Sequence, residues 1–139
     1  MEMFKIDQME LQKIRRQAEA AYPKECCGIL MENRENGQVK EIYQTGNADA
    51  VQRQMTHFLI DPLELYRAEQ YAGAENMEII GFYHSHADYP AVCSDEDKQA
   101  MIPGYIYMIV SVQRGVCAEI RVFRKVDFQG SVCEIDWES

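Results

Sequence analysis

Two stretches of the chain repeat their apolar residues at helical spacing. In residues 7–23 the apolar positions share one helical face: Leu11, Ile14, Ala18 and Ala21. Asp7 followed by Glu10 has the spacing of a capping box, and Pro23 is unable to continue a helix. This segment is therefore predicted to be a surface helix that covers a core.

The second stretch, residues 60–73, has matching start and stop signals. Asp61 can cap a helix, Pro62 suits the first helical position, and Glu64 completes the capping box. Gly73 is of the type that commonly follows a helix. A second helix is therefore predicted here.

The remaining apolar runs are short and typical of strands. They cover residues 26–33, 39–45, 54–60, 77–86, 105–112, 117–126 and 131–138. Turns are predicted at Asn36-Gly37, Arg114-Gly115 and Gln129-Gly130, and a short third helix over residues 94–101.

The order of these elements predicts a mixed α/β (α+β) domain. Helix, strands, helix, central strand, short helix and strands follow one another, with an antiparallel meander near the C-terminus. The regular alternation of a doubly wound parallel sheet is missing. No linker or repeat divides the 139 residues, so one domain over residues 1–139 is expected.

Composition excludes some classes of function. A formal charge of −9 disfavours nucleic-acid binding, which needs a surplus of Lys and Arg. The first residues contain no long apolar segment, and no later run approaches about 18 apolar residues, so neither a signal peptide nor a membrane span is expected. Five cysteines without CxxC pairing fit reduced thiols. We therefore expect a cytoplasmic protein with no nucleic-acid or membrane partner.

Two of the three histidines lie one residue apart, at the end of the apolar run 77–86. Side chains at i and i+2 of a strand share a face, so His84 and His86 can reach one Zn²⁺ ion. Asp97 can be a third ligand if the intervening loop turns the chain back. Each residue also has a structural alternative, since a histidine at a strand end can simply be hydrogen-bonded, and Ser94 with Asp97 has capping-box spacing.

The pattern H-x-H-x7-S-x2-D, from His84 to Asp97, resembles the signature of the JAMM (MPN+) zinc metalloprotease domain at every defined position. The segment 23–28 is similar to the P-x-E-x-C-G stretch of compact bacterial members, such as the Mec-type CysO-cysteine peptidases. Further similarity covers residues 46–68 and 105–112. The resemblance implies a mixed, largely antiparallel curled sheet flanked by helices, similar to the cytidine deaminase-like fold.

The resemblance also implies a role for each residue of the motif. His84, His86 and Asp97 hold one Zn²⁺ per chain, and Glu25 acts as general base for the attacking water. Ser94 donates a hydrogen bond to the oxyanion, without an acyl-enzyme. Taken alone, Glu25 would fit an exposed surface acid.

Two positions depart from the family pattern. Bacterial relatives commonly have proline where this chain has Ala87 and Cys93, so the loop is expected to be less rigid. Cys93 is either a small loop filler or, by its chemistry, a competing zinc ligand or an oxidisable brake.

The substrate class follows from the resemblance alone. Compact bacterial relatives are similar to peptidases that act on the C-terminal tail of small ubiquitin-like sulfur carriers of the ThiS/MoaD type. An extended tail would add a strand to an exposed edge, for which residues 54–60 or those just before are the candidate. His57 in that segment fits a surface or structural role better than a third metal ligand. The sequence also allows a homodimer. The alternatives to a peptidase are a RadC-like domain or a non-catalytic MPN scaffold.

Overall fold

The computed structural model describes residues 2–129 and 131–139. Over these residues, seven strands form one sheet in the order β1-β7-β6-β5-β4-β2-β3. The strands are β1 (Met3–Lys5), β2 (Cys27–Asn33), β3 (Val39–Thr45), β4 (Met77–Ala87), β5 (Ile106–Gln113), β6 (Val116–Lys125) and β7 (Val132–Glu138). The helices are α1 (Gln8–Ala21), α2 (Pro62–Ala74), α3 (Asp95–Ala100) and the single 3-10 turn η1 (Val51–Arg53).

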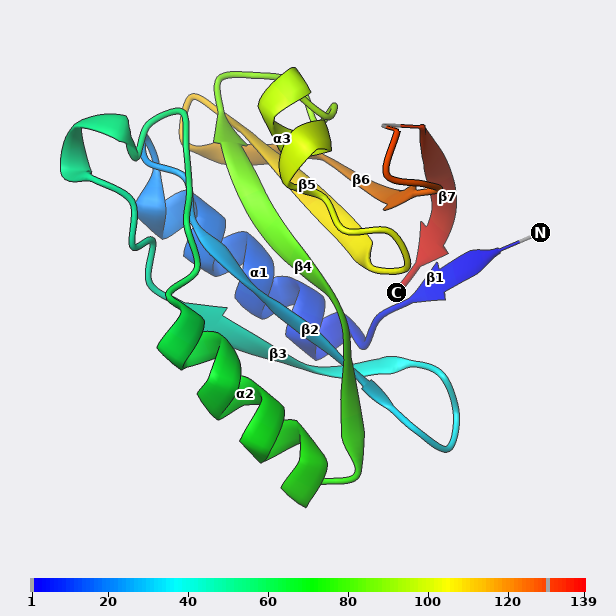
Figure 1. Cartoon of the computed structure of the whole chain (residues 1–139). Helices are drawn as coiled ribbons and strands as arrows, with labels where there is room; N and C mark the ends of the chain where they lie inside the picture. The colour runs from blue at the N-terminus through cyan, green and yellow to red at the C-terminus, as the bar shows by residue number, and fades with distance from the viewer. Residues whose placement is uncertain (1, 130) are drawn as a thin grey trace.

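Most neighbouring strands run antiparallel, as predicted. The meander β5-β6-β7 is antiparallel, and so are the pairs β2–β3 and β2–β4. The pairs β4–β5 and β1–β7 are parallel. The sheet curls far enough that Ile6, just after β1, bridges Val39 at the start of β3 (Figure 1).

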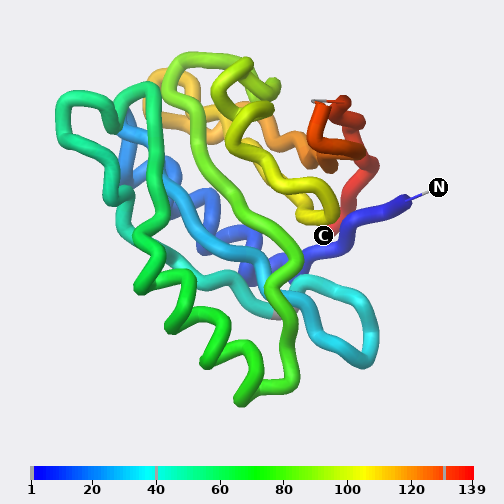
Figure 2. Tube along the Cα trace, in the orientation of Figure 1, coloured from blue at the N-terminus to red at the C-terminus, as the bar shows by residue number. Residues whose placement is uncertain are grey.

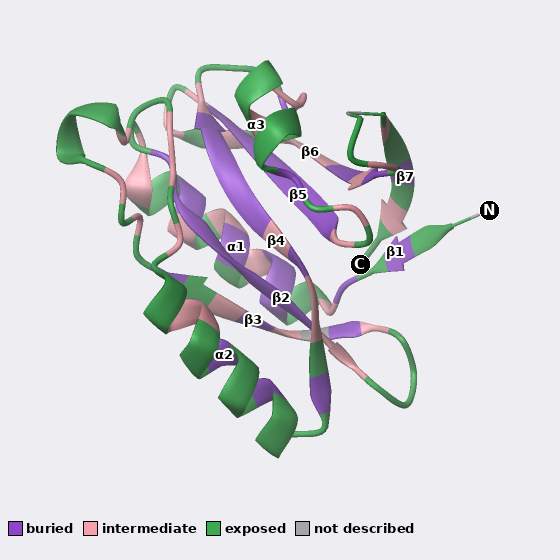
Figure 3. Cartoon of the chain, viewed as in Figure 1, coloured by how far each residue is buried: buried purple, intermediate pink, exposed green. Residues whose placement is uncertain are grey.

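The helices divide between the two faces of the sheet. α1 packs its predicted apolar face against one side, where Leu11, Ile14 and Ala18 join a core with residues of β2, β4, β5 and β6. α2 and α3 lie on the other side, over separate clusters (Figure 1). Figure 3 shows the central strands buried between these layers and the outer side of α2 exposed. Among the described residues, no helix has both the length and the apolar character needed to span a membrane.

Some sequence predictions were wrong in detail. Residues 54–60 form no strand: they follow η1 as turns and irregular chain. β1 was missed because three residues are too short for a period-2 pattern. Asp7 caps α1 as expected, but Glu10 does not close a capping box, since its buried carboxylate accepts the N–H of Ile42 on β3. The turn at Gln129-Gly130 includes a residue outside the described ranges.

The pairing of β2 with β4 brings together the P-x-E-x-C-G segment and the H-x-H motif of the sequence. Cys27 stands opposite His84 and Gly28 opposite Tyr83. The Tyr83 ring passes so close to Gly28 that a Cβ there would lie 2.2 Å from it. The glycine of the P-x-E-x-C-G segment is therefore required by packing. This close contact seats the residues that precede β2 beside the end of β4.

Candidate metal centre and active site

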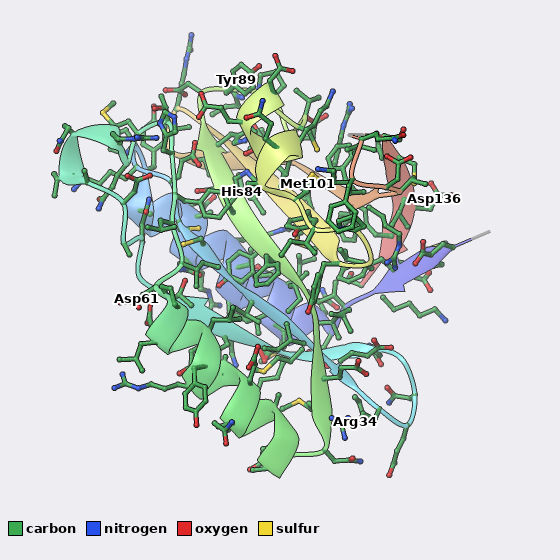
Figure 4. All side chains as sticks on the ribbon, in the orientation of Figure 1. Arg34, Asp61, His84, Tyr89, Met101 and Asp136 are labelled. Atoms are coloured by element: carbon green, nitrogen blue, oxygen red, sulfur yellow. The ribbon has the colours of Figure 1, made fainter. Side chains whose placement is uncertain are left out.

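The C-terminal end of β4 presents two buried histidines on the face that α3 covers. The Nε2 atoms of His84 and His86 lie 3.2 Å apart. The Nδ1–H of His86 donates to the carbonyl of Pro90 at 2.8 Å, which leaves its Nε2 lone pair free to face His84. Figure 4 labels His84 on the upper part of β4, with Tyr89 beyond the strand end.

Asp97, in the first turn of α3, completes the group. Its Oδ1 is 3.3 Å from His84 Nε2 and its Oδ2 is 3.2 Å from His86 Nε2. The Asp97 N–H donates to Ser94 Oγ and the Ser94 N–H donates to Asp97 Oδ2, both at 3.0 Å. The capping box and the converging ligand atoms are therefore present together. The two interpretations of Ser94 and Asp97 do not compete.

The loop between β4 and α3 is held by the strands beside it. Ser111 on β5 donates through Oγ to the carbonyl of Tyr89 at 2.6 Å. Glu119 on β6 accepts the N–H of Ala91 at 3.1 Å. These bonds fix the return of the chain that places Asp97 against the histidines, despite the absence of the family's prolines.

The spacing of the three side chains fits a zinc ion. In a tetrahedron with bonds of 2.0–2.1 Å, ligand atoms are about 3.3–3.4 Å apart. Here the three separations are 3.2, 3.3 and 3.2 Å. Burial lowers the pKa of His84, which favours the neutral imidazole that a metal needs. Burial works to raise the pKa of Asp97, but His84 and His86 outweigh it and hold that pKa below its ordinary value.

Glu25 lies two residues before β2 and lines the same cavity as the three candidate ligands. It is only 6% exposed, so it is not the surface acid that its position alone would suggest. Burial raises the pKa of Glu25 to about 8, an effect that the nearby His86 partly opposes. A cation held by the histidines would favour its carboxylate form, because opposite charges lower a carboxyl pKa.

Most of the chain, including the segments that form this site, matches a known family. The family model for prokaryotic homologs of the JAB domain matches residues 8–124. The chain belongs to the prokaryotic JAB-domain family. This JAB domain is 31% identical over 90 residues to a desampylase from Haloferax volcanii, and 28% identical over 91 residues to one from Pyrococcus furiosus. These matches cover 64% and 66% of the chain and 63% and 61% of the relatives, so the chain spans about three fifths of their length.

Solved structures show the same fold. A protein from Desulfitobacterium hafniense has a TM-score of 0.82 at 26% identity, with 99% of this chain and 92% of that one covered. A JAB1/MPN domain protein from Archaeoglobus fulgidus shares the fold at a TM-score of 0.60 and 18% identity, over 98% and 100% of the two chains. The predicted JAMM/MPN resemblance and the curled α+β sheet are thus confirmed.

A cavity of about 780 Å³ lies over the ligand group of this JAB domain, between α3 and residues 55–60. The Phe58 ring stacks on His84, with centroids 4.3 Å apart and planes at 20°. His57 lies outside the ligand group and contacts Glu96 of α3 through Nε2. Figure 2 shows the segment between β3 and α2 as a long excursion beside the end of β4. The contact between His57 and Glu96 therefore joins the two sides of the cavity, residues 55–60 and α3, next to the candidate ligands.

Phe58 and Glu96 are absent from the residues predicted from sequence. Phe58 belongs to an apolar run that was interpreted as a strand, and Glu96 adjoins Asp97 with no motif of its own. The loop between β3 and α2 brings Phe58 to the site, and the return of the chain at α3 brings Glu96.

Cys93 lies outside the group of three candidate metal ligands. Its Sγ contacts the sulfur of Met101 at 3.9 Å, under α3. Burial raises the pKa of the Cys93 thiol to about 11, so the reactive thiolate is disfavoured at neutral pH. The contact supports the loop-filler interpretation over a competing ligand or an oxidisable brake.

Proposed function

We propose that this JAB domain, over residues 1–139, is a zinc-dependent peptidase. It hydrolyses an amide bond at the C-terminal tail of a small ubiquitin-like protein of the ThiS/MoaD sulfur-carrier type. The observation that carries the proposal is the convergence of His84, His86 and Asp97 at tetrahedral spacing with Glu25 buried in the same cavity.

Each residue has one assigned role. His84, His86 and Asp97 hold the Zn²⁺ ion, which when bound makes water acidic enough to supply hydroxide near neutral pH. Glu25 accepts the proton of the attacking water and delivers it to the departing amine. The Ser94 hydroxyl accepts the Asp97 N–H, so its own proton is free to be donated to the oxyanion of the carbonyl under attack.

The cavity wall offers a place for an extended tail. The backbone of Leu59 is occupied, since its N–H donates to Asn47 Oδ1 and its C=O accepts the Ala48 N–H. The N–H and C=O of Phe58 have no hydrogen-bond partner within residues 2–129 and 131–139. We assign Phe58 as the edge to which a substrate tail pairs, although the segment is not a regular strand.

The substrate class is supported by the relatives. Both relatives are named desampylases, and this name agrees with the ubiquitin-like substrate class that the motif resemblance implies. All five cysteines are free in the described part of the chain, which supports a cytoplasmic location.

The test uses zinc-loaded protein and purified sulfur carriers whose C-terminal Gly-Gly carries one or more added residues. Mass spectrometry should show loss of the added residues, and no loss after the metal is chelated. A protein that purifies without metal, stays folded and cleaves no carrier would support the scaffold alternative instead.

A further inference from the structure

Asn47, two residues beyond β3, uses the full hydrogen-bonding capacity of its side-chain amide. Nδ2 donates to the carbonyls of Glu25 and His57, both at 3.0 Å. Oδ1 accepts the N–H groups of Asp49 and Leu59, both at 3.1 Å. An amide has two donors and two acceptor positions, so none is left over. The orientation is also unique, because a flipped amide would face carbonyls with oxygen and N–H groups with nitrogen.

The partners of Asn47 belong to two parts of the site: the proposed general base Glu25, and the cavity wall around Phe58. Glu25 carries the carboxyl assigned to proton transfer. His57 and Leu59 flank Phe58, whose ring stacks on His84 and which lines the cavity. The Glu25 N–H donates to the carbonyl of Gln54 at 2.7 Å, so both peptide groups of Glu25 are held by this segment.

The segment has little regular structure to hold it in place. Between Thr45 and Pro62 it contains only the three-residue turn η1, as far as the described residues show. One backbone bond, from the Glu25 N–H to the Gln54 carbonyl, ties the segment to the start of β2. The side-chain bonds of Asn47 reach both Glu25 and residues 57–59 of the cavity wall.

We propose that Asn47 is a positioning residue that couples the cavity wall at Phe58 to the placement of Glu25. The proposal rests on the proposed function, in which a tail pairs with Phe58 and Glu25 moves the proton. A tail that draws residues 57–59 against itself moves the two groups bonded to Asn47, and through Nδ2 the peptide of Glu25. Small displacements of a catalytic group cost large factors in rate, about 10²-fold for 1 Å.

Three variants separate coupling from simple loosening of the loop. N47D keeps the shape and the acceptor oxygen but turns an oxygen toward the carbonyls of Glu25 and His57. N47A removes all four bonds. Q54A is the matched control, because the Gln54 side chain also makes two bonds in this segment, to the carbonyls of Asn47 and Asp49. The substitution keeps the backbone carbonyl of residue 54, which accepts the Glu25 N–H.

In zinc-loaded protein, N47D is expected to lower kcat by about 30- to 100-fold with unchanged metal content. N47A should lower kcat similarly and raise KM for a long tail more than for a short one. Q54A should stay within about threefold of the wild type. In an E25Q background, N47D should lower the residual rate no further, because the two changes act on the same step.

Amide hydrogen exchange on metal-free protein gives a readout that needs no activity. In N47A the Glu25 and Leu59 amides should exchange at least about tenfold faster, with Ile29 in the middle of β2 unchanged as internal reference. Unchanged exchange at Glu25 would overturn the coupling, as would an equal loss of kcat in Q54A. If the wild type cleaves no carrier, the proposed function fails, and the exchange result still decides whether Asn47 links the two segments.

Discussion

Asp97 combines two tasks that a sequence presents as alternatives. The same Oδ2 that accepts the Ser94 N–H also faces His86, so the cap geometry directs the carboxylate at the histidines. The motif predicted this group of residues because its spacing is rigidly tied to a strand end and a helix start. It did not predict Asn47 or Phe58, whose roles depend on an irregular loop without a local pattern.

At Glu25, removal of the carboxylate should separate chemistry from metal binding. Glu25→Gln keeps the size of the side chain and leaves the ligands in place, so zinc stoichiometry should stay at one per chain. Turnover should fall by at least about 10²-fold, since the proton acceptor is lost. His84→Ala serves as the contrast and should lose the metal itself. Near-normal turnover by Glu25→Gln would remove Glu25 from its assigned role.

At the scale of elements, the helices and most strands were predictable because their periodicity and end signals agree. α1 begins at the residue after its predicted Asp7 cap, and α2 follows Asp61 in the same way. The failure at residues 54–60 has a physical reason. Apolar side chains there line a cavity instead of a sheet face, and β propensity alone does not distinguish these environments.

Substitutions at Ser94 test two roles of one hydroxyl at the start of α3. It caps the helix, and it is assigned to donate a hydrogen bond to the oxyanion. Ser94→Ala should cost about 1 kcal/mol in urea unfolding through the lost cap. Its kcat should fall further, by about 10²–10³-fold, through the lost donor. Ser94→Thr keeps both groups and should stay within about tenfold of wild-type kcat. If kcat of folded Ser94→Ala fell by no more than the lost stability accounts for, Ser94 would act only as the helix cap.

For the whole molecule, the sheet order decides where the site forms, and no local pattern reveals it. β2 lies between β3 and β4 although α2 and a long loop separate β3 from β4 in sequence. The family resemblance implied a largely antiparallel curled sheet flanked by helices, and composition and periodicity predicted a mixed sheet, but neither gave this strand order.

Burial of Glu25 should affect the stability of the entire metal-free protein. Its pKa rises to about 8 in the folded state from an ordinary value of 4.5. The folded protein thus binds more protons than the unfolded chain between these values, and stability must fall as pH rises from about 4.5 to 8. Metal-free Glu25→Gln should avoid this loss. Urea unfolding with a chelator at pH 5 and pH 8.5 should show the variant gaining on the wild type at the higher pH, by up to about 4 kcal/mol. A constant difference between the two proteins would show that Glu25 ionises freely.

The pairing of β1 with β7 also constrains the order in which the protein folds during synthesis. Met3 stands beside Asp136 in that pair, so almost the whole described chain separates two neighbours in space. On a ribosome the chain emerges from its N-terminus, and this contact can form only after Asp136 has been synthesised. Until then the edge of β6 that β7 covers is available to other chains, while β2, β4 and α3, around which the candidate metal centre lies, can already assemble.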